Sequence, residues 1–249
     1  MSLKKYSNKL GFVLYKIYLC TMTFGIITIS FKRKKVLQLF LASIKRLRQE
    51  VEYFPCVVVG DEDHKDLCGQ YGVHHITQDN HPATRKFNTG VDYLMGIGCE
   101  YALVMGSDDI MSTDLLKNLM AEMEKGYDLI GISQIYFYAG DGKFKGKLRY
   151  LVTHGQYLGV ARCIHRRIIE MVGTVWNIDK SWGMDGVALR NIMSHIKTKK
   201  LVNGVCVDVK TADNMNKWTF WLHRVDTTCP SEIFYDIMGE EEKQLLNEI

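Results

Sequence analysis

Two adjacent carboxylates follow an apolar run near the middle of the chain. The segment Tyr101–Gly106 (YALVMG) is typical of a buried strand, and Asp108 and Asp109 follow it after one residue, Ser107. Neighbouring acids at a strand end repel each other unless a cation lies between them or a helix end neutralises them. A divalent cation on a diphosphate needs such hard oxygen ligands. The pair is therefore a candidate metal site; the alternative is that one of the two acids caps the following helix.

A third acid stands at the start of a predicted helix. In the segment Trp182–Arg190 (WGMDGVALR), an aromatic residue and a glycine precede Asp185. The helix macrodipole favours the charged form of an acid at this position. A carboxylate placed there beside a pocket can act as a general base. Asp185 is thus a candidate catalytic base, and a plain helix cap is the alternative.

Two cations open another predicted helix, in Thr84–Gly90 (TRKFNTG). Together with the free N–H groups of the first helical turn, Arg85 and Lys86 can hold an anionic ligand. A solvent-facing basic turn would have the same sequence. The eight histidines show no metal-binding spacing such as HExxH.

Alternating strands and helices are predicted to position these side chains. Strands are expected at Phe24–Ser30, Cys56–Gly60, His74–Thr77 and Tyr101–Gly106, with helices after Phe31–Lys35, at Lys65–Gln70 and at Thr84–Gly96. This order predicts an α/β fold with a parallel sheet covered by helices. Carboxyl ends of parallel strands meet at one edge, where such sheets bind ligands. That edge would carry three polar clusters: Ser30–Arg33, Gly60–Asp63 and Ser107–Asp109.

The second half of the chain is less regular. Strands are expected at Asp128–Ala139, Lys147–Val152 and Val205–Val209, with a hairpin turn at Asp141. Helices are expected at Arg162–Val172, Gly186–Ile196 and Glu240–Ile249. No linker divides the chain, so we expect one domain over residues 23–249 after an extension of residues 1–22.

Composition excludes several classes of protein. The chain has 249 residues, 47% of them apolar and 24% charged, which is not typical of a disordered or collagen-like protein. Seven cysteines without a CxxC pair argue against a disulfide framework and a zinc ribbon. They favour a reducing compartment, and we expect a cytoplasmic protein.

Positive charge is concentrated near the N-terminus. The first 50 residues contain eleven Lys or Arg and one acid, Glu50. This asymmetry suggests contact with a polyanion or a membrane surface through residues 1–48; a solvated basic face is the alternative. The fifteen uncharged residues between Lys16 and Lys32 are too few for a membrane-spanning helix.

The order of these motifs resembles the family 2 glycosyltransferases of the GT-A fold. The resemblance covers roughly Phe24 to Arg190 and rests on SFKR, the strand ending in Gly60-Asp61, RKFNTG, LVMGSDD and WGMDGVALR. It implies a mostly parallel, Rossmann-like central sheet with a smaller antiparallel part on the acceptor side. The chain departs from the family at Gly106, where the DxD motif usually begins with Asp, and at Met184, where the ED motif usually has Glu.

The resemblance also implies roles for single residues. Asp185 would be the catalytic base, and Asp108 and Asp109 would hold Mn²⁺ or Mg²⁺. The implied nucleotide-sugar contacts are Ser30, Phe31, Arg33, Asp61, Arg85, Lys86, Asn88 and Asp108. A further metal or diphosphate contact would come from His223, Asp208 or Asp213.

The implied activity is that of a metal-dependent, inverting glycosyltransferase of the hexosyltransferase type. It would move a sugar from a nucleoside diphosphate sugar to a hydroxyl of a glycan, lipid, protein or modified nucleic acid. Two alternatives stay open: a nucleotidyltransferase on the same sheet, and a basic nucleic-acid- or membrane-binding module with a degenerate transferase site.

Overall fold

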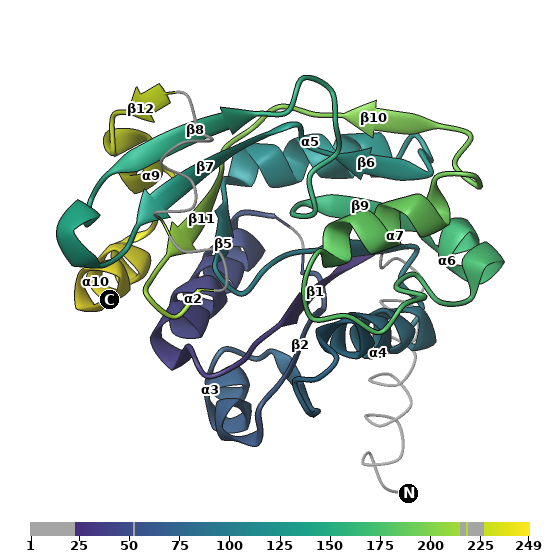
Figure 1. Ribbon diagram of the computed structural model, residues 1–249, viewed down its shortest axis with the longest axis horizontal. Helices are drawn as coiled ribbons and strands as arrows, with labels where there is room; N and C mark the ends of the chain where they lie inside the picture. Colours follow the sequence, from purple (N-terminus) through teal and green to yellow (C-terminus); the bar gives the residue numbers. More distant parts are fainter. Residues whose placement is uncertain (1–22, 52, 215–217, 219–226) are drawn as a thin grey trace, which may run out of the picture.

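The computed structural model describes residues 23–51, 53–214, 218 and 227–249, whose strands form two sheets (Figure 1). The strand order of the first sheet is β10 (Lys199–Leu201), β6 (Leu129–Gly131), β9 (Arg162–His165), β4 (Tyr101–Val104), β1 (Phe24–Ile29), β2 (Cys56–Gly60), β3 (His74–Thr77). The order of the second is β12 (Thr227–Cys229), β8 (Leu148–Val152), β7 (Gln134–Ala139), β11 (Cys206–Lys210), β5 (Asp109–Met111).

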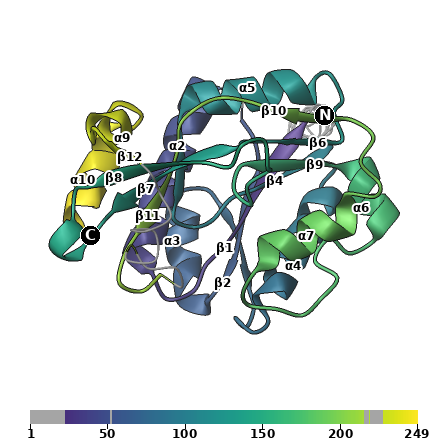
Figure 2. The same cartoon turned by 45° about the horizontal axis from the view of Figure 1, so that its top comes forward.

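The first sheet is parallel except at β9, which runs antiparallel to both of its neighbours. Its strands β1 and β2 are almost entirely apolar and buried, as expected where helices cover both faces. One layer consists of α2 (Lys34–Glu50), α3 (Lys65–Gln70) and α5 (Thr113–Met123); the other consists of α4 (Ala83–Gly96), α6 (Arg166–Val172) and α7 (Met184–Ile192). Figure 2 shows these layers on either side of the sheet. The predicted mostly parallel α/β architecture is confirmed.

The second sheet places four residues in one row across its strands. Asp109 pairs with Asp208, Asp208 with Phe137, and Phe137 with Arg149. Directly paired residues share a face of a sheet, so two acids and an aromatic ring lie side by side. The opposite face packs against α9 (Glu232–Asp236) and α10 (Glu240–Glu248) in the larger hydrophobic core.

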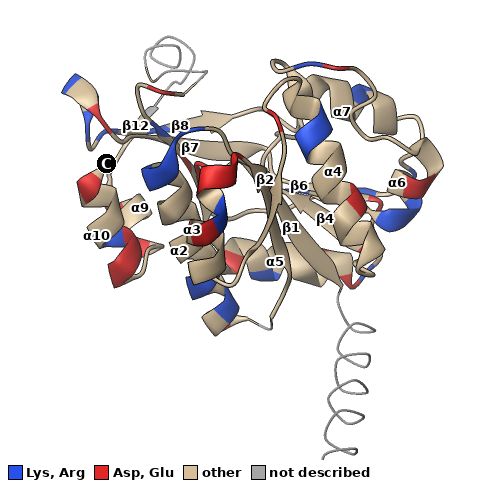
Figure 3. Cartoon of the chain, turned by 90° about the horizontal axis from the view of Figure 1, so that it is seen from below, with Lys and Arg blue, Asp and Glu red and all other residues tan. Residues whose placement is uncertain are grey.

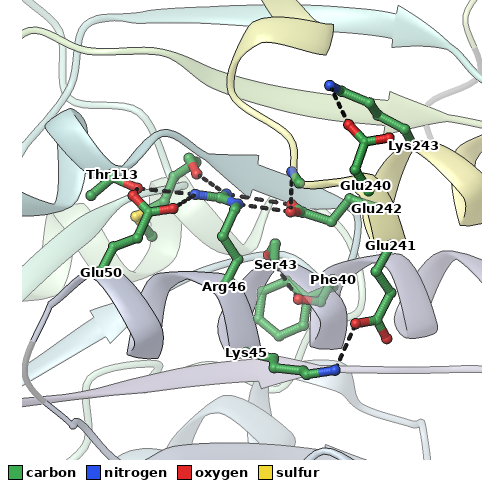
Figure 4. Close-up of polar contacts among 12 residues, drawn as sticks. Phe40, Ser43, Lys45, Arg46, Glu50, Thr113, Glu240, Glu241, Glu242 and Lys243 are labelled. Carbon is green, nitrogen blue, oxygen red and sulfur yellow. Dashed lines mark hydrogen bonds and ion pairs between the residues drawn. The ribbon is translucent and has the colours of Figure 1, made fainter.

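A polar network fastens α10 to the rest of the fold (Figure 4). Arg46 on α2 donates through Nε to Glu242 at 2.7 Å and through Nη2 to the carbonyl oxygen of Met111 at 3.0 Å. Its Nη1 donates to Thr113 at 3.0 Å. Only 1% of the Glu242 side chain is exposed. One guanidinium therefore joins the C-terminal helix to the end of β5, the strand that begins with Asp109.

Three predicted elements differ from the structure. The expected strand at Asp128–Ala139 is two strands, β6 and β7, which belong to different sheets. The expected helix at Arg162–Val172 begins as strand β9, because its first residues pair with β4 and β6 at the centre of the sheet. Asp109 does not cap a helix but starts β5; Ser112 caps α5 by accepting the N–H of Leu115.

Charges of both signs lie interspersed over α2, α3 and α10 (Figure 3). Lys45 and Arg46, within the basic segment singled out in the sequence, pair with Glu241 and Glu242 of α10. This part of the predicted polyanion footprint therefore has protein partners. The extension at residues 1–22 lies outside the described residues. Among the residues that are described, every helix is too short or too polar to cross a bilayer.

Candidate active site

A cavity of about 380 Å³ opens at the carboxyl ends of β1 and β4. Its wall takes residues from both sheets and from the start of α7. Open α/β sheets bind ligands at this edge because strand-end loops and helix N-termini converge there. Of the residues predicted to do chemistry, Ser30, Phe31, Arg33, Asp108, Asp109, Asp185, Asp208 and Asp213 line the cavity.

Three carboxylates meet at the base of this cavity. Asp108, Asp109 and Asp208 each offer an oxygen within 4.8 Å of the others. The Oδ1 atom of Asp208 is buried without a hydrogen-bond partner. A buried, unpartnered carboxylate oxygen is costly unless a cation or proton satisfies it. Three hard oxygen donors with one unsatisfied atom fit a divalent cation of the Mg²⁺ or Mn²⁺ kind.

Two built-in cations already contact this acid cluster. Arg33 Nη1 lies 2.8 Å from Asp108, and Lys210 forms an ion pair with Asp208. Asn214 also donates to Asp108. Burial opposes ionisation of Asp108, yet Arg33 and Lys210 hold its pKa below the ordinary value. The cluster is thus only partly neutralised by the protein itself.

Asp109 and Asp208 hold their protons more tightly than Asp108 does. Burial, together with the charges of Asp208 and Asp108, raises the pKa of Asp109 well above its ordinary value. Burial and the charge of Asp108 raise the pKa of Asp208 to about 7, although Lys210 opposes this. A carboxyl group whose proton is held by repulsion readily exchanges it for a metal ion.

Gly106 lies directly beneath the acid pair. Its N–H donates to Asp109 Oδ2 at 2.5 Å. A Cβ atom at position 106 would lie 2.6 Å from this oxygen and 2.7 Å from Asp108 Oδ1. In family members the first aspartate of the DxD motif stands at the position of Gly106. In this chain the carboxylate of Asp109 fills the space that such a side chain would need.

Asp185 lies across the cavity in the first turn of α7. The helix begins after Gly183, whose φ of 66° is the left-handed conformation that glycine adopts without strain. The carboxyl group of Asp185 is exposed and packs flat on Gly159: a Cβ atom at 159 would be 2.0 Å from its Cγ. The absence of a side chain at 159 gives Asp185 its place at the cavity mouth.

A buried arginine supports this arrangement from behind. Arg162 is 1% exposed and donates to the carbonyl oxygens of Leu158 at 3.1 Å and Asp185 at 3.3 Å. Ala161, just before it, has a φ of 52°, which is strained for a residue with a side chain. The turn from Leu158 to Arg162 thus holds both the backbone and the carboxyl group of Asp185.

The residues predicted to contact the nucleotide form a connected network beside β1. Ser30 Oγ lies 2.8 Å from Nδ1 of the buried His64. Lys86 is fully buried and donates to the carbonyl oxygen of Ser30 at 2.8 Å. Asp61 accepts the N–H of Lys32 at 2.8 Å. These contacts hold the backbone of Ser30–Arg33 in place, whereas Asp61 and Lys86 are not themselves part of the cavity wall.

The structure does not bring Arg85 and Asn88 to the cavity. Arg85 points outward and pairs with Asp179, and its side chain is 61% exposed. Asn88 exchanges two hydrogen bonds with the backbone of Trp176, at 2.9 and 3.0 Å. Arg85 and Asn88 lie outside the cavity because the helical period of α4 turns these two positions away from the strand ends. His223 lies outside the described residues.

Sequence reasoning misses Lys210, Asn214, Gly159 and Arg162. Lys210 and Asn214 follow the predicted strand at Val205–Val209, so their place at a strand end is a signal that the sequence does contain. Arg162 is hidden because its segment has the pattern of a helix. For Gly159, only the packing against Asp185 reveals the role.

The comparisons with known proteins agree with this geometry. The sequence model described as "Glycosyl transferase family 2" matches residues 25–182. The chain therefore belongs to the glycosyl transferase family 2. The comparison with curated proteins returns no match.

Solved structures share the fold at low sequence identity. The crystal structure of S. aureus TarS 1-349 has a TM-score of 0.58 and 14% identity, over 76% of this chain and 60% of that one. Glucosyl-3-phosphoglycerate synthase from Mycobacterium tuberculosis has a TM-score of 0.52 and 11% identity, over 77% and 73%. The mannosyltransferase PcManGT from Pyrobaculum calidifontis, in complex with GDP-Man and Mn²⁺, has a TM-score of 0.52 and 12% identity, over 79% and 59%. The fold is that of the GT-A proteins, and this chain spans about three fifths of the first and third of these.

Proposed function

We propose that the protein is a metal-dependent, inverting glycosyltransferase of the hexosyltransferase type. Its donor would be a nucleoside diphosphate sugar and its acceptor a hydroxyl compound. One observation carries this proposal: a single cavity joins the acid cluster Asp108, Asp109 and Asp208 to Asp185, although these acids come from separate elements.

The part of the cavity at the end of β1 would bind the donor. Ser30 and Phe31 lie at the strand end where a nucleoside would sit, and Phe31 offers a partly exposed ring. Arg33 is next to the acid cluster and can move from Asp108 to a phosphate oxygen. The proposed donor therefore lies with its base over Ser30 and Phe31 and its diphosphate over the acids.

The three acids would hold Mn²⁺ or Mg²⁺. When bound, the ion would neutralise charge on the leaving diphosphate, the charge that grows during the reaction. Arg33 and Lys210 border the same place and can stabilise that charge directly.

Asp185 would take the proton from the acceptor hydroxyl. The acceptor oxygen then bonds to the anomeric carbon from the side opposite the diphosphate. The bond between that carbon and the phosphate oxygen breaks with its electron pair, and a nucleoside diphosphate leaves. Attack from the opposite side would invert the anomeric centre, and it needs a base on the acceptor side; we assign this role to Asp185, which lines the same cavity.

The test uses a panel of nucleotide sugars with Mn²⁺ and measures the released phosphate compounds. Release of a nucleoside diphosphate is expected, and release of pyrophosphate from a nucleoside triphosphate would instead identify a nucleotidyltransferase. Asp185→Asn should reduce turnover at least a thousandfold and leave donor affinity within twofold. Asp179→Asn, an exposed carboxylate outside the cavity, is the matched control. Normal turnover by Asp185→Asn would refute the assignment of the base.

A further inference from the structure

A second groove lies along α7, the helix whose first turn carries Asp185. It measures about 560 Å³ and lies between residues 155–157, the outer part of α7 and the edge strand β10. The walls of the two hollows are close in the chain: residues 158–160 and Asp185 line the cavity, whereas Tyr157, just before Leu158, and Leu189, one helical turn after Asp185, line the groove. A ligand that extends from the groove along α7 towards the start of the helix would reach the proposed base.

The rim of the groove is basic. Lys199 and Lys200 line it, and both are exposed on β10. Within the part of the chain that the structure describes, no carboxylate forms an ion pair with either lysine. The eight residues that line the groove include these two lysines and no Asp or Glu. The lining of the groove thus carries positive charge that no acid of the same lining offsets.

The floor of the groove is apolar. Tyr157, Leu189, Met193 and Leu201 provide an aromatic ring and three aliphatic side chains. The half-buried ring of Tyr157 lies against Gly131, where an added Cβ atom would be 3.0 Å from it. Burial raises the pKa of Tyr157 to about 12, so the hydroxyl group stays neutral.

We infer that this groove binds a single-stranded nucleic acid that carries the acceptor hydroxyl. A basic rim beside an aromatic and aliphatic floor is the combination that holds phosphates and stacks bases at once. Neutral glycans would leave the lysines without partners, and polyol phosphates have no flat apolar face for the floor. The inference rests on the proposed function, since it names the acceptor of that same site.

The test measures binding of a fluorescein-labelled 20-nucleotide DNA single strand to the full chain by fluorescence anisotropy. The charge reversal Lys199→Glu with Lys200→Glu should weaken binding at least tenfold. It should also lower the slope of log affinity against log salt by about 0.7 for each phosphate that the protein no longer neutralises. The matched control is Lys143→Glu with Lys145→Glu, on the turn between β7 and β8 at the opposite end of the molecule (Figure 1), which should change affinity less than twofold.

A second readout locates the strand. Irradiation of a bromodeoxyuridine-containing strand should crosslink to Tyr157 or Met193, as identified by mass spectrometry. Equal binding by both double variants, or crosslinks confined to other surfaces, would overturn the inference. So would a charge-reversed variant that loses binding to vesicles with 30% phosphatidylglycerol but keeps the DNA strand, because the groove would then be a lipid site.

Donor binding separates this inference from the proposed function. If the wild-type chain binds a nucleoside diphosphate with Mn²⁺ but the lysine variants bind DNA normally, the groove assignment fails and the proposed function stands. If no nucleotide binds while DNA binding depends on the two lysines, the transferase proposal fails and the groove is still a nucleic-acid site.

Discussion

The guanidinium of Arg33 lies 2.8 Å from the carboxylate of Asp108, which is 75 residues further along the chain. Each residue follows a strand of the first sheet, and β1 and β4 are direct neighbours there. The pair places a protein cation beside the carboxylates that would hold a metal ion. A metal ion bound there would therefore compete with Arg33 for Asp108, and a phosphate would offer Arg33 a different partner.

Arg33→Gln separates these two effects. We expect it to weaken nucleoside diphosphate binding at least tenfold, because the variant can no longer donate a charge-assisted hydrogen bond to phosphate. Affinity for Mn²⁺ alone should rise, because Asp108 no longer has a competing cation. Titration calorimetry with each ligand measures both changes. Arg85→Gln is the matched control, since Arg85 lies on the surface with Asp179; if the two variants behave alike, Arg33 has no role at the diphosphate.

The pKa of Asp208 predicts a pH-dependent response to metal. Because it is raised from 3.8 to about 7 in the folded protein, the folded state binds more protons than the unfolded state between these values. Stability contributed by this group is thus full below pH 4 and is lost as pH rises through 7. A metal ion replaces the proton, so Mn²⁺ should raise the melting temperature more at pH 8 than at pH 6.

Thermal unfolding with and without Mn²⁺ at the two pH values checks this response. Asp208→Asn should flatten the pH dependence and remove most of the Mn²⁺ effect. A Mn²⁺ shift of the same size at both pH values would show that the metal does not replace a proton in this cluster.

The contact between Gly159 and Asp185 predicts the effect of one added methyl group. In Gly159→Ala the new Cβ would overlap the Asp185 carboxyl group, which must move. A displacement of about 1 Å at a reacting group can lower turnover about a hundredfold. We expect that reduction in kcat, with donor affinity and melting temperature nearly unchanged. Gly69→Ala is the control, because a methyl group added there on α3 would have nothing within 4 Å; an active Gly159→Ala enzyme would contradict the assigned position of the base.

The network in Figure 4 predicts where the C-terminal helix matters for stability. Glu242→Ala removes the buried partner of Arg46 and leaves its guanidinium only the half-exposed Glu50, at 3.9 Å, as a counter-charge. Breaking a buried ion pair from one side costs about 3 kcal/mol of unfolding free energy. Glu240→Ala, at a carboxylate whose side chain is 84% exposed, should cost less than about 0.5 kcal/mol. Urea unfolding measures both values, and equal costs would contradict the role of Arg46.

Much of the first sheet follows from the sequence. Runs such as FGIITI and CVVVG have no polar alternation, and this pattern predicts strands covered on both faces. Because parallel strands end at one edge, the sequence also predicts that Arg33 and Asp108 lie near each other. The sequence alone does not rank Asp208 above Asp213 or His223 as a metal contact. The reason is that the end of a predicted strand does not show which other strand it will pair with.

The second sheet could not be predicted in the same way. Asp109 belongs to β5, a strand of three residues that pairs with β11, nearly a hundred positions further along the chain. Arg162 looks helical in sequence because the helix α6 follows it closely, but its strand lies between β4 and β6. Short strands and buried charges are decided by such long-range pairing, which local sequence patterns do not contain.

The central claim is that Asp108, Asp109 and Asp208 hold a divalent cation that anchors a diphosphate. Titration calorimetry of nucleoside diphosphates in Mn²⁺, compared with the same titration in chelator, tests it most directly. The claim predicts binding of one nucleotide that chelator weakens at least tenfold and that Asp108→Asn and Asp208→Asn each abolish. Tight binding that is equal in Mn²⁺ and in chelator, and unchanged in both variants, would contradict it.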